Sequence, residues 1–312
     1  MSEPAFARDV VYLSGGVGGA RLLYGLARAL PPGRLTAIVN TGDDFDHWGL
    51  RICPDLDTCI YTLAGLGDWE RGWGVRGDTT HALAMIERLG GDSWFSIGDA
   101  DLGTHLVRSR WLAEGVPLTG VVARQCRALG VATRILPMSE DPIATMLDTY
   151  EHGTLSLQDW LVRERGEPRV RRVHFVGSAR ASTHAVAALE NAGLIVIGPS
   201  NPYVSIDPIL SLPGVRELLT GRPVIGVSPI VWGRAVKGPL AGMVRDLTGA
   251  QPSAAAVARH YGELLWGMVV ERGDERALGH LPSLATRTVM RTPDDSERLA
   301  REVLAFGESV CR

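Results

Sequence analysis

Apolar residues in the first half of the chain fall into short runs that alternate with stretches of helical spacing. Strands are predicted at 10–14 and 35–40, and a helix between them, from Ala20 to Leu30, ends at a Pro-Pro-Gly turn. The same pattern predicts further helices at 79–89, 104–114 and 118–129, and strands at 94–98 and 133–138. Strands that alternate with helices over short connections are typical of a parallel sheet covered on both faces.

Residues 144–175 break this pattern, because polar and apolar positions alternate there around a His-Gly turn. This alternation predicts antiparallel strands, after which the run 171–177 is expected to return to the core. Further strands are predicted at 194–200, 223–229 and 268–270, and helices at 182–192, 253–264 and 295–306. We therefore predict one α/β domain over residues 1–312: a Rossmann-like, doubly wound, mainly parallel sheet with a mainly helical insertion at about 60–130.

Composition excludes several classes of protein. Hydrophobic residues at 45% and charged residues at 21% are ordinary for a globular chain, and a net charge of −3 gives no general attraction to nucleic acid or anionic lipid. No apolar run approaches the roughly 18 residues of a membrane span, and residues 1–9 lack the pattern of a signal peptide. We expect a cytoplasmic protein without a nucleic-acid or membrane partner. The four cysteines form no CxxC pair and are typical of reduced packing residues.

The stretch SGGVGGAR at 14–21 separates the first strand from the first helix. Glycine allows a tight turn and a close backbone approach to an anion, and the following helix N-terminus favours negative charge. Candidate phosphate-binding residues are therefore Gly15, Gly16, Gly18 and Gly19. No lysine follows as in an ATPase-type P-loop, and the second strand ends in Asn40 rather than in a ribose-binding acid. The alternative is a glycine turn needed only for packing of strand against helix.

Five aspartates follow the second strand within fifteen residues, in NTGDDFDHWGLRICPDLDT at 40–58. Carboxylates at this density repel one another unless they are solvated or bind a cation. Mg²⁺ prefers one or two carboxylates together with water and substrate phosphates, and Asp43 and Asp57 are the candidate ligands. Asp44 and Asp46 are more typical of a solvated acidic loop, and Asp57 has the alternative role of a helix cap.

Two more polar loops follow predicted strands. GPSNPYVSIDPIL at 198–210 offers hydroxyl, amide and backbone N–H groups that suit a phosphate or a base edge, with Ser200, Asn201, Pro202 and Ser205 as candidates. VSPIVWGRAVKGPLAGM at 227–243 brings Lys237 to the same edge of the sheet, where it is a candidate phosphate contact. The alternatives are a proline-rich connection and a solvated lysine.

Weaker features lie in the predicted insertion. GDADLGTHLVRS at 98–109 places His105 and Arg108 on one helix face. DWERGWGVRGDT at 68–79 carries Trp73 and Arg76, which suit a flat ring, although a Trp-rich loop is more typical of local packing. No GxSxG or HExxH motif occurs. From the residues alone we predict a Mg²⁺-assisted enzyme that acts on a phosphorylated or nucleotide substrate, and transfer chemistry is favoured over hydride chemistry.

Together the motifs resemble those of the 2-phospho-L-lactate transferases of coenzyme F(420) biosynthesis. They are SGGVGGAR, NTGDD, RICPDLDT, RGWGVRGDT, GD-x-D-x-x-THLVRS, ILPMSEDP, IGPSNPYVSIDPIL and SPIVWG-x-x-VKGP, in family order over about residues 10–245. The resemblance implies that the ribityl hydroxyl of the deazaflavin Fo attacks a guanosine diphosphate ester, releasing GMP and forming coenzyme F(420)-0 or an analogue. The ester carries 2-phospho-L-lactate, phosphoenolpyruvate or 3-phosphoglycerate, and the sequence does not select among them.

The resemblance also implies roles for individual residues. Asp43 and Asp57 would hold Mg²⁺, and Asp57 would orient or deprotonate the attacking hydroxyl, so Asp57→Asn is expected to reduce turnover far more than folding. The glycine loop, the 200–202 segment and Lys237 would bind phosphates and guanosine. The deazaflavin would lie near Asp57, and near the further residues Trp73, Arg76, His105 and Arg108. Many relatives have Arg where this chain has Ala100. A homodimer is expected.

Two alternatives remain at this point. A sister family shares the core but is regarded as a nucleotide-sugar-binding regulator without transfer chemistry; it lacks the RICPDLDT and VKGP segments found here. An NAD-dependent oxidoreductase is disfavoured by the missing ribose-binding acid and the crowded aspartates. For the acid of the donor, Met138, Tyr203 and Trp232 are suggested neighbours.

Overall fold

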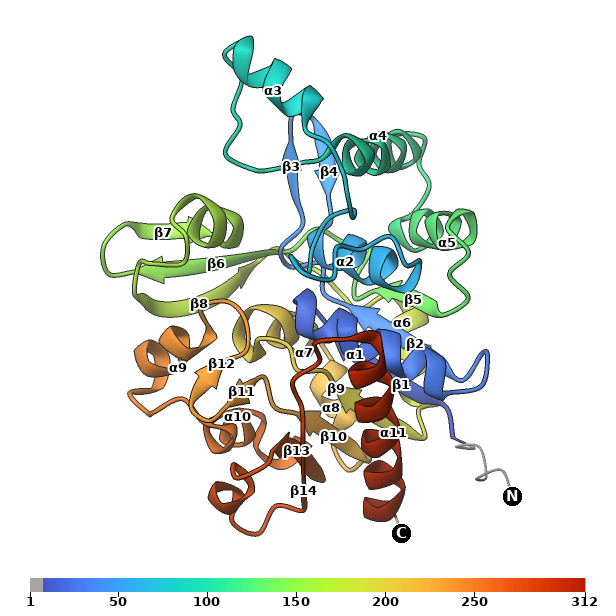
Figure 1. Cartoon of the computed structure of the whole chain (residues 1–312), viewed down its shortest axis with the longest axis vertical. Coiled ribbons are helices and arrows are strands. Elements are labelled where there is room, and N and C mark those ends of the chain that lie inside the picture. The colour runs from blue at the N-terminus through green and yellow to red at the C-terminus, as the bar shows by residue number, and fades with distance from the viewer. Residues whose placement is uncertain (1–7, 312) are drawn as a thin grey trace.

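The computed structural model describes residues 8–311, whose centre is a sheet of seven parallel strands with helices on both faces (Figure 1). Every neighbouring pair in this sheet is parallel. Strands buried on both faces are built from continuous apolar runs, such as the LIVI of β9. The predicted α/β, doubly wound, mainly parallel sheet is confirmed. The strands lie in the order β14 (Ser283–Thr286), β13 (Gly267–Glu271), β10 (Val224–Val227), β9 (Leu194–Ile197), β1 (Val10–Ser14), β2 (Leu35–Val39) and β5 (Arg134–Pro137).

Side chains of alternate residues on β1 enter two separate apolar cores. Val10 and Tyr12 belong to the core beneath α1 (Gly16–Ala29) and α11 (Pro293–Val310), whereas Val11 and Leu13 belong to the core on the opposite face. The chain leaves β1 and β9 toward these opposite faces, through α1 and through the π-helix η2 (Pro202–Ile206) respectively. A crevice therefore opens between the carboxyl ends of β1 and β9, where ligands bind in open α/β sheets.

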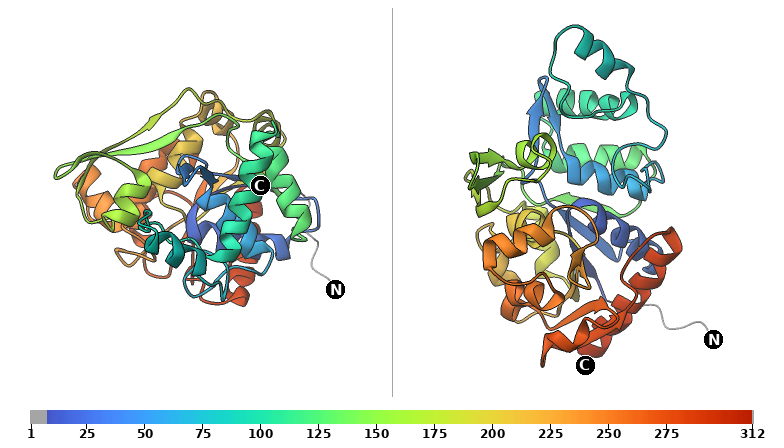
Figure 2. Two further views of the ribbon diagram at one scale, coloured as in Figure 1. Left: turned by 90° about the horizontal axis from the view of Figure 1, so that it is seen from above. Right: turned by 60° about the vertical axis from the view of Figure 1, so that its left-hand side comes forward.

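Residues between β2 and β5 form a hairpin and four helices, and Figure 2 shows α3 and α4 standing away from the central sheet. The expected strand at 94–98 is wrong: the segment is an irregular loop whose Phe95 ring packs edge-on against Phe45, 4.9 Å between centroids. Its apolar side chains serve this aromatic cluster and not a sheet. The elements are β3 (Phe45–His47), β4 (Leu50–Ile52), α2 (Pro54–Leu63), α3 (His81–Arg88), α4 (Asp99–Ala113) and α5 (Leu118–Ala128).

The expected antiparallel strands form a separate three-stranded sheet in the order β7-β6-β8, so that prediction is confirmed. The run 171–177 returns to the core through Val173 and Phe175, which pack against the apolar core on the second face of the sheet, but β8 pairs with β6 and does not join the central sheet. Arg171 and Arg172 on β8 are exposed, and a strand buried on both faces would have to bury them. The strands are β6 (Ala144–Thr149), β7 (Gly153–Ser156) and β8 (Val170–Val176).

The remaining elements connect these strands and cover the second face of the sheet. Among residues 8–311 no helix is long and apolar enough to cross a membrane; residues 1–7, which bore on the expectation about a signal peptide, lie outside the described residues. The remaining elements are the π-helix η1 (Asp159–Arg163), α6 (Thr183–Glu190), α7 (Asp207–Leu210), α8 (Val215–Leu219), β11 (Ile230–Val231), β12 (Arg234–Ala235), α9 (Leu240–Thr248), α10 (Ala254–Tyr261), and the 3₁₀ turns η3 (Gly262–Leu264) and η4 (Glu275–Leu278).

Candidate functional site

The glycine-rich stretch lies in the crevice between β1 and β9. Helix α1 begins at Gly16 and not at the predicted Ala20, so three of the four candidate glycines lie in its first turn and not in a preceding loop. The hydroxyl of Ser200 donates to the carbonyl of Gly15 over 2.7 Å and accepts from the Gly15 N–H over 3.3 Å. These two bonds fix the loop after β9 against the start of α1, where backbone N–H groups suit an anion.

Two of the glycines are required by close packing. A Cβ on Gly18 would lie 2.4 Å from the carbonyl oxygen of Pro199, and one on Gly19 would lie 2.5 Å from the hydroxyl oxygen of Ser14. A side chain at position 18 would therefore push the loop after β9 away from α1, and one at position 19 would displace the Ser14 and Ser200 hydroxyls. Gly19 is buried behind the crevice, so the alternative of a glycine needed only for packing of strand against helix applies to it. Gly15, Gly16 and Gly18 line the crevice.

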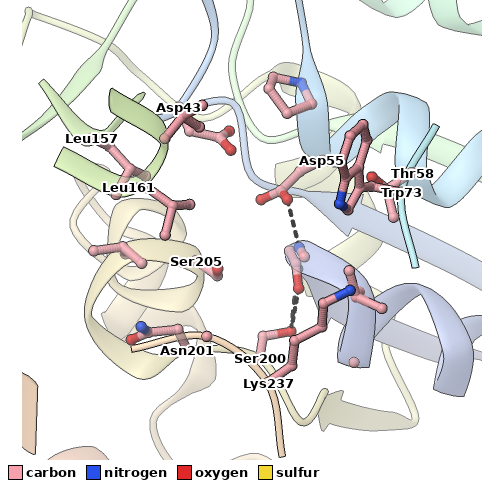
Figure 3. Close-up of a pocket in the computed structure, with 18 of the residues that line it drawn as sticks. Asp43, Asp55, Thr58, Trp73, Leu157, Leu161, Ser200, Asn201, Ser205 and Lys237 are labelled. Atoms are coloured by element: carbon pink, nitrogen blue, oxygen red, sulfur yellow. Dashed lines mark hydrogen bonds between the residues drawn. The ribbon is translucent and has the colours of Figure 1, made fainter. Parts of the chain in front are cut away.

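The loop after β9 is held by its own polar side chains. The Asn201 side chain accepts from the N–H of Tyr203 over 3.0 Å and caps η2, and its amide donates to the Met243 sulfur over 3.3 Å. Ser205 faces the crevice one helical turn later, whereas Pro202 is buried and does not line it. The π-helical turn thus presents Asn201 and Ser205 on one side, opposite the glycines of α1 (Figure 3).

The aspartates come together because helix α2 begins directly behind the loop after β2. Asp55 and Asp57 lie in the first turn of α2, which Pro54 opens. Asp55 accepts from the N–H of Gly16 over 2.5 Å and from the Asn40 amide over 2.9 Å. Asp55 has no role in the prediction from sequence; Pro54 followed by two aspartates in the first turn is the helix-start signal that would have found it.

The ionisation of these carboxylates reflects their crowding. Burial raises the pKa of Asp43 well above its usual value, and the neighbouring charges of Asp55 and Asp44 raise it further. Burial also raises the pKa of Asp55 to about 6, against the lowering effect of its hydrogen bond from Asn40. Burial raises the pKa of Asp44 to about 7, although Arg51 opposes it. The expectation that Asp44 is solvated is therefore wrong; Asp46, with 73% of its side chain exposed, is a solvated residue.

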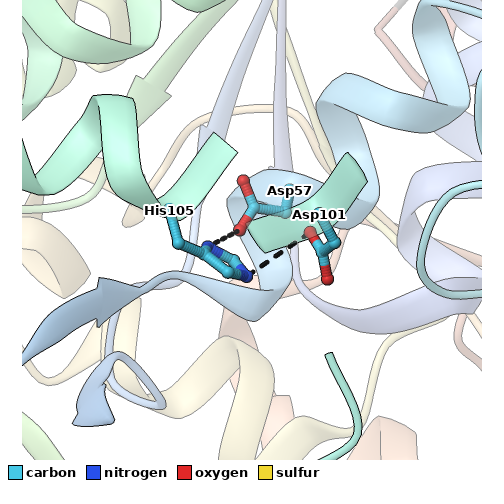
Figure 4. A group of neighbouring side chains, drawn as sticks. All are labelled: Asp57, Asp101 and His105. Carbon is cyan, nitrogen blue, oxygen red and sulfur yellow. Dashed lines mark ion pairs between the residues drawn. The ribbon is translucent and has the colours of Figure 1, made fainter. Parts of the chain in front are cut away.

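Asp57 belongs to a buried network with helix α4 (Figure 4). Both of its oxygens accept from the Arg108 guanidinium, one over 3.0 Å. The same guanidinium donates to Nδ1 of His105 over 3.1 Å, and Nε2 of His105 lies 3.4 Å from Asp101. Tyr61 donates to Asp101 over 2.7 Å, so α2 and α4 are joined by a continuous polar chain. A spacing of i, i+4 and i+7 places the three α4 residues on one helix face.

Two clusters of acidic side chains are candidate cation sites. Asp57, Asp101 and His105 place one ligand atom each within 4.8 Å of one another. The Arg108 guanidinium lies against this triad, and Mg²⁺ disfavours a nitrogen ligand, so the triad does not suit that ion. Asp43, Asp55 and Asp57 line the cavity together, and a bound divalent cation would favour the ionised form of the Asp43 carboxyl, whose side chain otherwise contacts the Asn40 amide. The residues present therefore fit Mg²⁺ at Asp43.

One side of the crevice is closed by the 68–77 loop. Lys237 donates to the carbonyl of Arg71, and burial together with the nearby charge of Arg21 lowers the pKa of Lys237. Arg21 donates to the carbonyls of Met290, over 2.9 Å, and Trp69. Arg21 lies inside SGGVGGAR and has no role in the prediction from sequence; in the structure it fastens the 68–77 loop to the glycine stretch.

The residues predicted to contact the deazaflavin ring do not all line the cavity. Trp73 and His105 line the cavity, whereas Arg76 lies outside its lining and Arg108 is buried behind it. Trp94 and Phe95 line the cavity instead, but they fall in the segment mistaken for a strand and were therefore missed. Of the suggested neighbours of the donor acid, none lines the cavity; these are Met138, Tyr203 and Trp232.

The loops enclose a cavity of about 890 Å³, near the upper end of the range for small-molecule sites. Figure 3 shows Asp43 and Asp55 at one end of the view and Asn201, Ser200 and Lys237 at the other, with Leu157 and Leu161 on the wall that faces Trp73. A carboxylate cluster and a helix N-terminus thus open into the same space.

The parallel sheet, the crevice between β1 and β9 and this cavity define an α/β protein whose ligand site lies at the carboxyl ends of its strands. Residues 10–298 match the family described as 2-phospho-L-lactate transferase CofD. The chain belongs to this transferase family. The family predicted from the sequence motifs is confirmed.

Curated relatives and solved structures agree with this membership. A phosphoenolpyruvate transferase of Streptomyces griseus is 38% identical, over 96% of this chain and 99% of the relative. A 2-phospho-L-lactate transferase of Methanosarcina barkeri is 37% identical, over the same shares of the two chains. A crystal structure of a UPF0052 family protein from Bacillus halodurans superposes with a TM-score of 0.64 at 16% identity, covering 95% of this chain and 99% of that one, and shows the shared fold.

Proposed function

We propose that this transferase moves a phospho-acid from a guanosine diphosphate ester to the terminal ribityl hydroxyl of the deazaflavin Fo. The hydroxyl oxygen attacks the phosphorus that carries the acid, the bridging P–O bond breaks, and GMP leaves. The product is coenzyme F(420)-0 or its dehydro or glyceryl analogue. The observation that carries the proposal is the meeting, in one cavity, of the α1 N-terminus, the Ser200 loop and three aspartates.

Charge placement supports a displacement at a diphosphate. Such reactions depend on in-line positioning and on compensation of negative charge more than on covalent catalysis. Gly15, Gly16 and Gly18, with Ser200 and the 201–205 turn, are proposed to bind the phosphates and the guanosine. Lys237 would contribute a positive charge from the opposite loop.

The proposed metal ion is Mg²⁺, held by Asp43 and Asp57. Bound there, it would neutralise charge on the diphosphate during displacement. Asp57 is also the proposed acceptor of the hydroxyl proton, and the Arg108 pair holds its carboxylate in a fixed orientation. Asp55 holds the first turn of α1 through the Gly16 N–H, so its role is to position the glycine stretch.

The deazaflavin ring is proposed to lie against the aromatic residues of the cavity. Trp73 and His105 are the predicted contacts, and the structure adds Trp94 and Phe95 as lining residues. Stacked or edge-on aromatic contacts suit a flat conjugated ring. Because relatives named for phosphoenolpyruvate and for 2-phospho-L-lactate are 38% and 37% identical, similarity does not select the acid.

The test is a product assay. The protein is incubated with Fo, Mg²⁺ and each of the three guanylated donors, and GMP and phosphodeazaflavin are followed by mass spectrometry. We expect both products with one donor, and loss of both after EDTA treatment with recovery on excess Mg²⁺. Absence of product with every donor overturns the proposal, and tight UDP-sugar binding would then favour the regulator alternative. Sedimentation and cell fractionation test the predicted homodimer and cytoplasmic location.

A further inference from the structure

Two arginines and one lysine line the cavity: Arg21, Arg165 and Lys237. Arg21 is held by two backbone carbonyls and Lys237 by one. Within residues 8–311, the Arg165 guanidinium makes no hydrogen bond or ion pair with another residue. Its guanidinium is therefore the lining cation with all its donors available to a ligand.

The backbone at Arg165 favours glycine. Its φ is 55°, in the left-handed region, and Trp48 and Trp232 are the other non-glycine residues of the described chain with positive φ. Arg165 follows η1, and the N–H of Gly166 closes that helix on the carbonyl of Trp160 over 2.7 Å. Glycine would meet this cap geometry without steric cost. A large charged side chain thus stands in the cavity wall at a position where the backbone prefers none.

Arg165 lies beside the loop that carries Lys237. A Cβ on Gly166 would be 3.2 Å from Cβ of Pro239, so the end of η1 packs directly against the Lys237-Gly238-Pro239 turn. Carboxylates line the same cavity and would repel an anionic ligand group; they are Asp43, Asp55, Asp57, Glu70 and Asp101. An additional anionic group on the substrate therefore needs a cation on the wall where Arg165 lies.

We propose that Arg165 binds the carboxylate of the acid that is transferred, while Lys237 serves the diphosphate. This inference rests on the proposed function. 2-Phospho-L-lactate, phosphoenolpyruvate and 3-phosphoglycerate share a carboxylate near the phosphoester, so the assignment holds whichever acid is used. The planar guanidinium fork binds a carboxylate through two parallel hydrogen bonds, whereas an ammonium acts as a point charge.

The experiment compares Arg165→Gly and Arg165→Lys with the wild-type enzyme. Arg165→Gly suits the left-handed backbone, so it is expected to fold. Calorimetry gives Kd for the donor and for GDP, which lacks the acid, and kinetics give KM for Fo. We expect Arg165→Gly to weaken donor binding about 10- to 100-fold, with Kd for GDP and KM for Fo within about twofold of wild type. Arg165→Lys should lie between. The control is Arg169→Gln, which removes an exposed arginine paired with Glu151, and it should change none of these values.

A donor analogue with a neutral amide in place of the carboxylate completes the test. The wild-type enzyme should bind it as weakly as Arg165→Gly binds the true donor, and Arg165→Gly should not distinguish the two ligands. Unchanged donor binding by Arg165→Gly, or an equal loss of GDP binding, overturns the inference. If the donor binds but no product forms, the proposed reaction is overturned, and the comparison of donor binding by wild type and Arg165→Gly still tests the inference. A wild-type protein that binds no donor overturns both.

Discussion

Arg108 of α4 and Asp57 of α2 form a two-bond ion pair whose side chains are 0% and 7% exposed. The pair joins the inserted helices to the helix that carries the aspartates. A residue 51 positions away therefore fixes the orientation of the carboxylate proposed to accept the substrate proton. Burial raises the pKa of Asp57, and the Arg108 charge acts against this rise.

Asp57→Asn should abolish turnover and also destabilise the protein, which differs from the expectation based on sequence alone. The substitution leaves the Arg108 charge buried without its partner, a loss of about 3–5 kcal/mol in the free energy of unfolding. Urea denaturation and the product assay measure the two effects. The double variant Asp57→Asn/Arg108→Met should recover most of the stability but no turnover. Active double-variant enzyme would remove Asp57 from the proposed mechanism.

Asp44 should make stability fall as the pH rises. The folded state holds its pKa at about 7, above the unfolded value of 3.8, so the folded protein binds this proton more tightly. The contribution of Asp44 to the free energy of unfolding is then full below about pH 4 and declines until the pH passes about 7. Asp44→Asn should remove on the order of 3 kcal/mol of this decline in urea titrations between pH 4.5 and 8, with EDTA present. The exposed Asp46→Asn is the control, and parallel wild-type and Asp44→Asn curves would contradict the prediction.

Gly18→Ala should open the crevice. The added methyl group would collide with the carbonyl of Pro199, which is backbone and moves only with its loop, so we expect a loss of about 1–3 kcal/mol and weaker GDP binding. Gly103→Ala is the matched control, because it lies inside α4 with nothing within 4 Å of the new methyl group. That variant should be as stable as wild type or more so by up to about 1 kcal/mol. Equal behaviour of the two variants would contradict the packing argument.

Asp43→Asn should weaken Mg²⁺ binding by at least about tenfold in calorimetry with GDP present, since it removes a charged oxygen ligand. The far-ultraviolet spectrum should be unchanged, because the Asp43 side chain contacts only the Asn40 amide, 3.3 Å away, among the hydrogen bonds of the described residues. Asp46→Asn, three residues further along the chain in β3 and exposed, should bind Mg²⁺ as wild type does. Unaltered Mg²⁺ affinity in Asp43→Asn would place the ion elsewhere.

Local patterns predicted most elements of the central sheet correctly. The continuous apolar runs at β1, β2, β9 and β10 are typical of strands covered on both faces. The helices between them indicate the crossover connections that parallel strands need. The pattern predicted a strand at 94–98 wrongly, because Phe95 in this segment packs on Phe45 and not in a sheet. It also missed α2, although Pro54 and the two aspartates in the first turn of this helix are a helix-start signal.

The sequence by itself determined the family, the parallel α/β fold and the polar loops at the ends of the strands, because each is written in contiguous residues. The tertiary structure decided which of those polar residues meet. It placed Asp55 against Gly16, paired Asp57 with Arg108 and left the Arg165 guanidinium unpaired within residues 8–311. Ion pairs, burial and pKa shifts depend on distances between segments far apart in the chain, and local spacing carries no information about those distances.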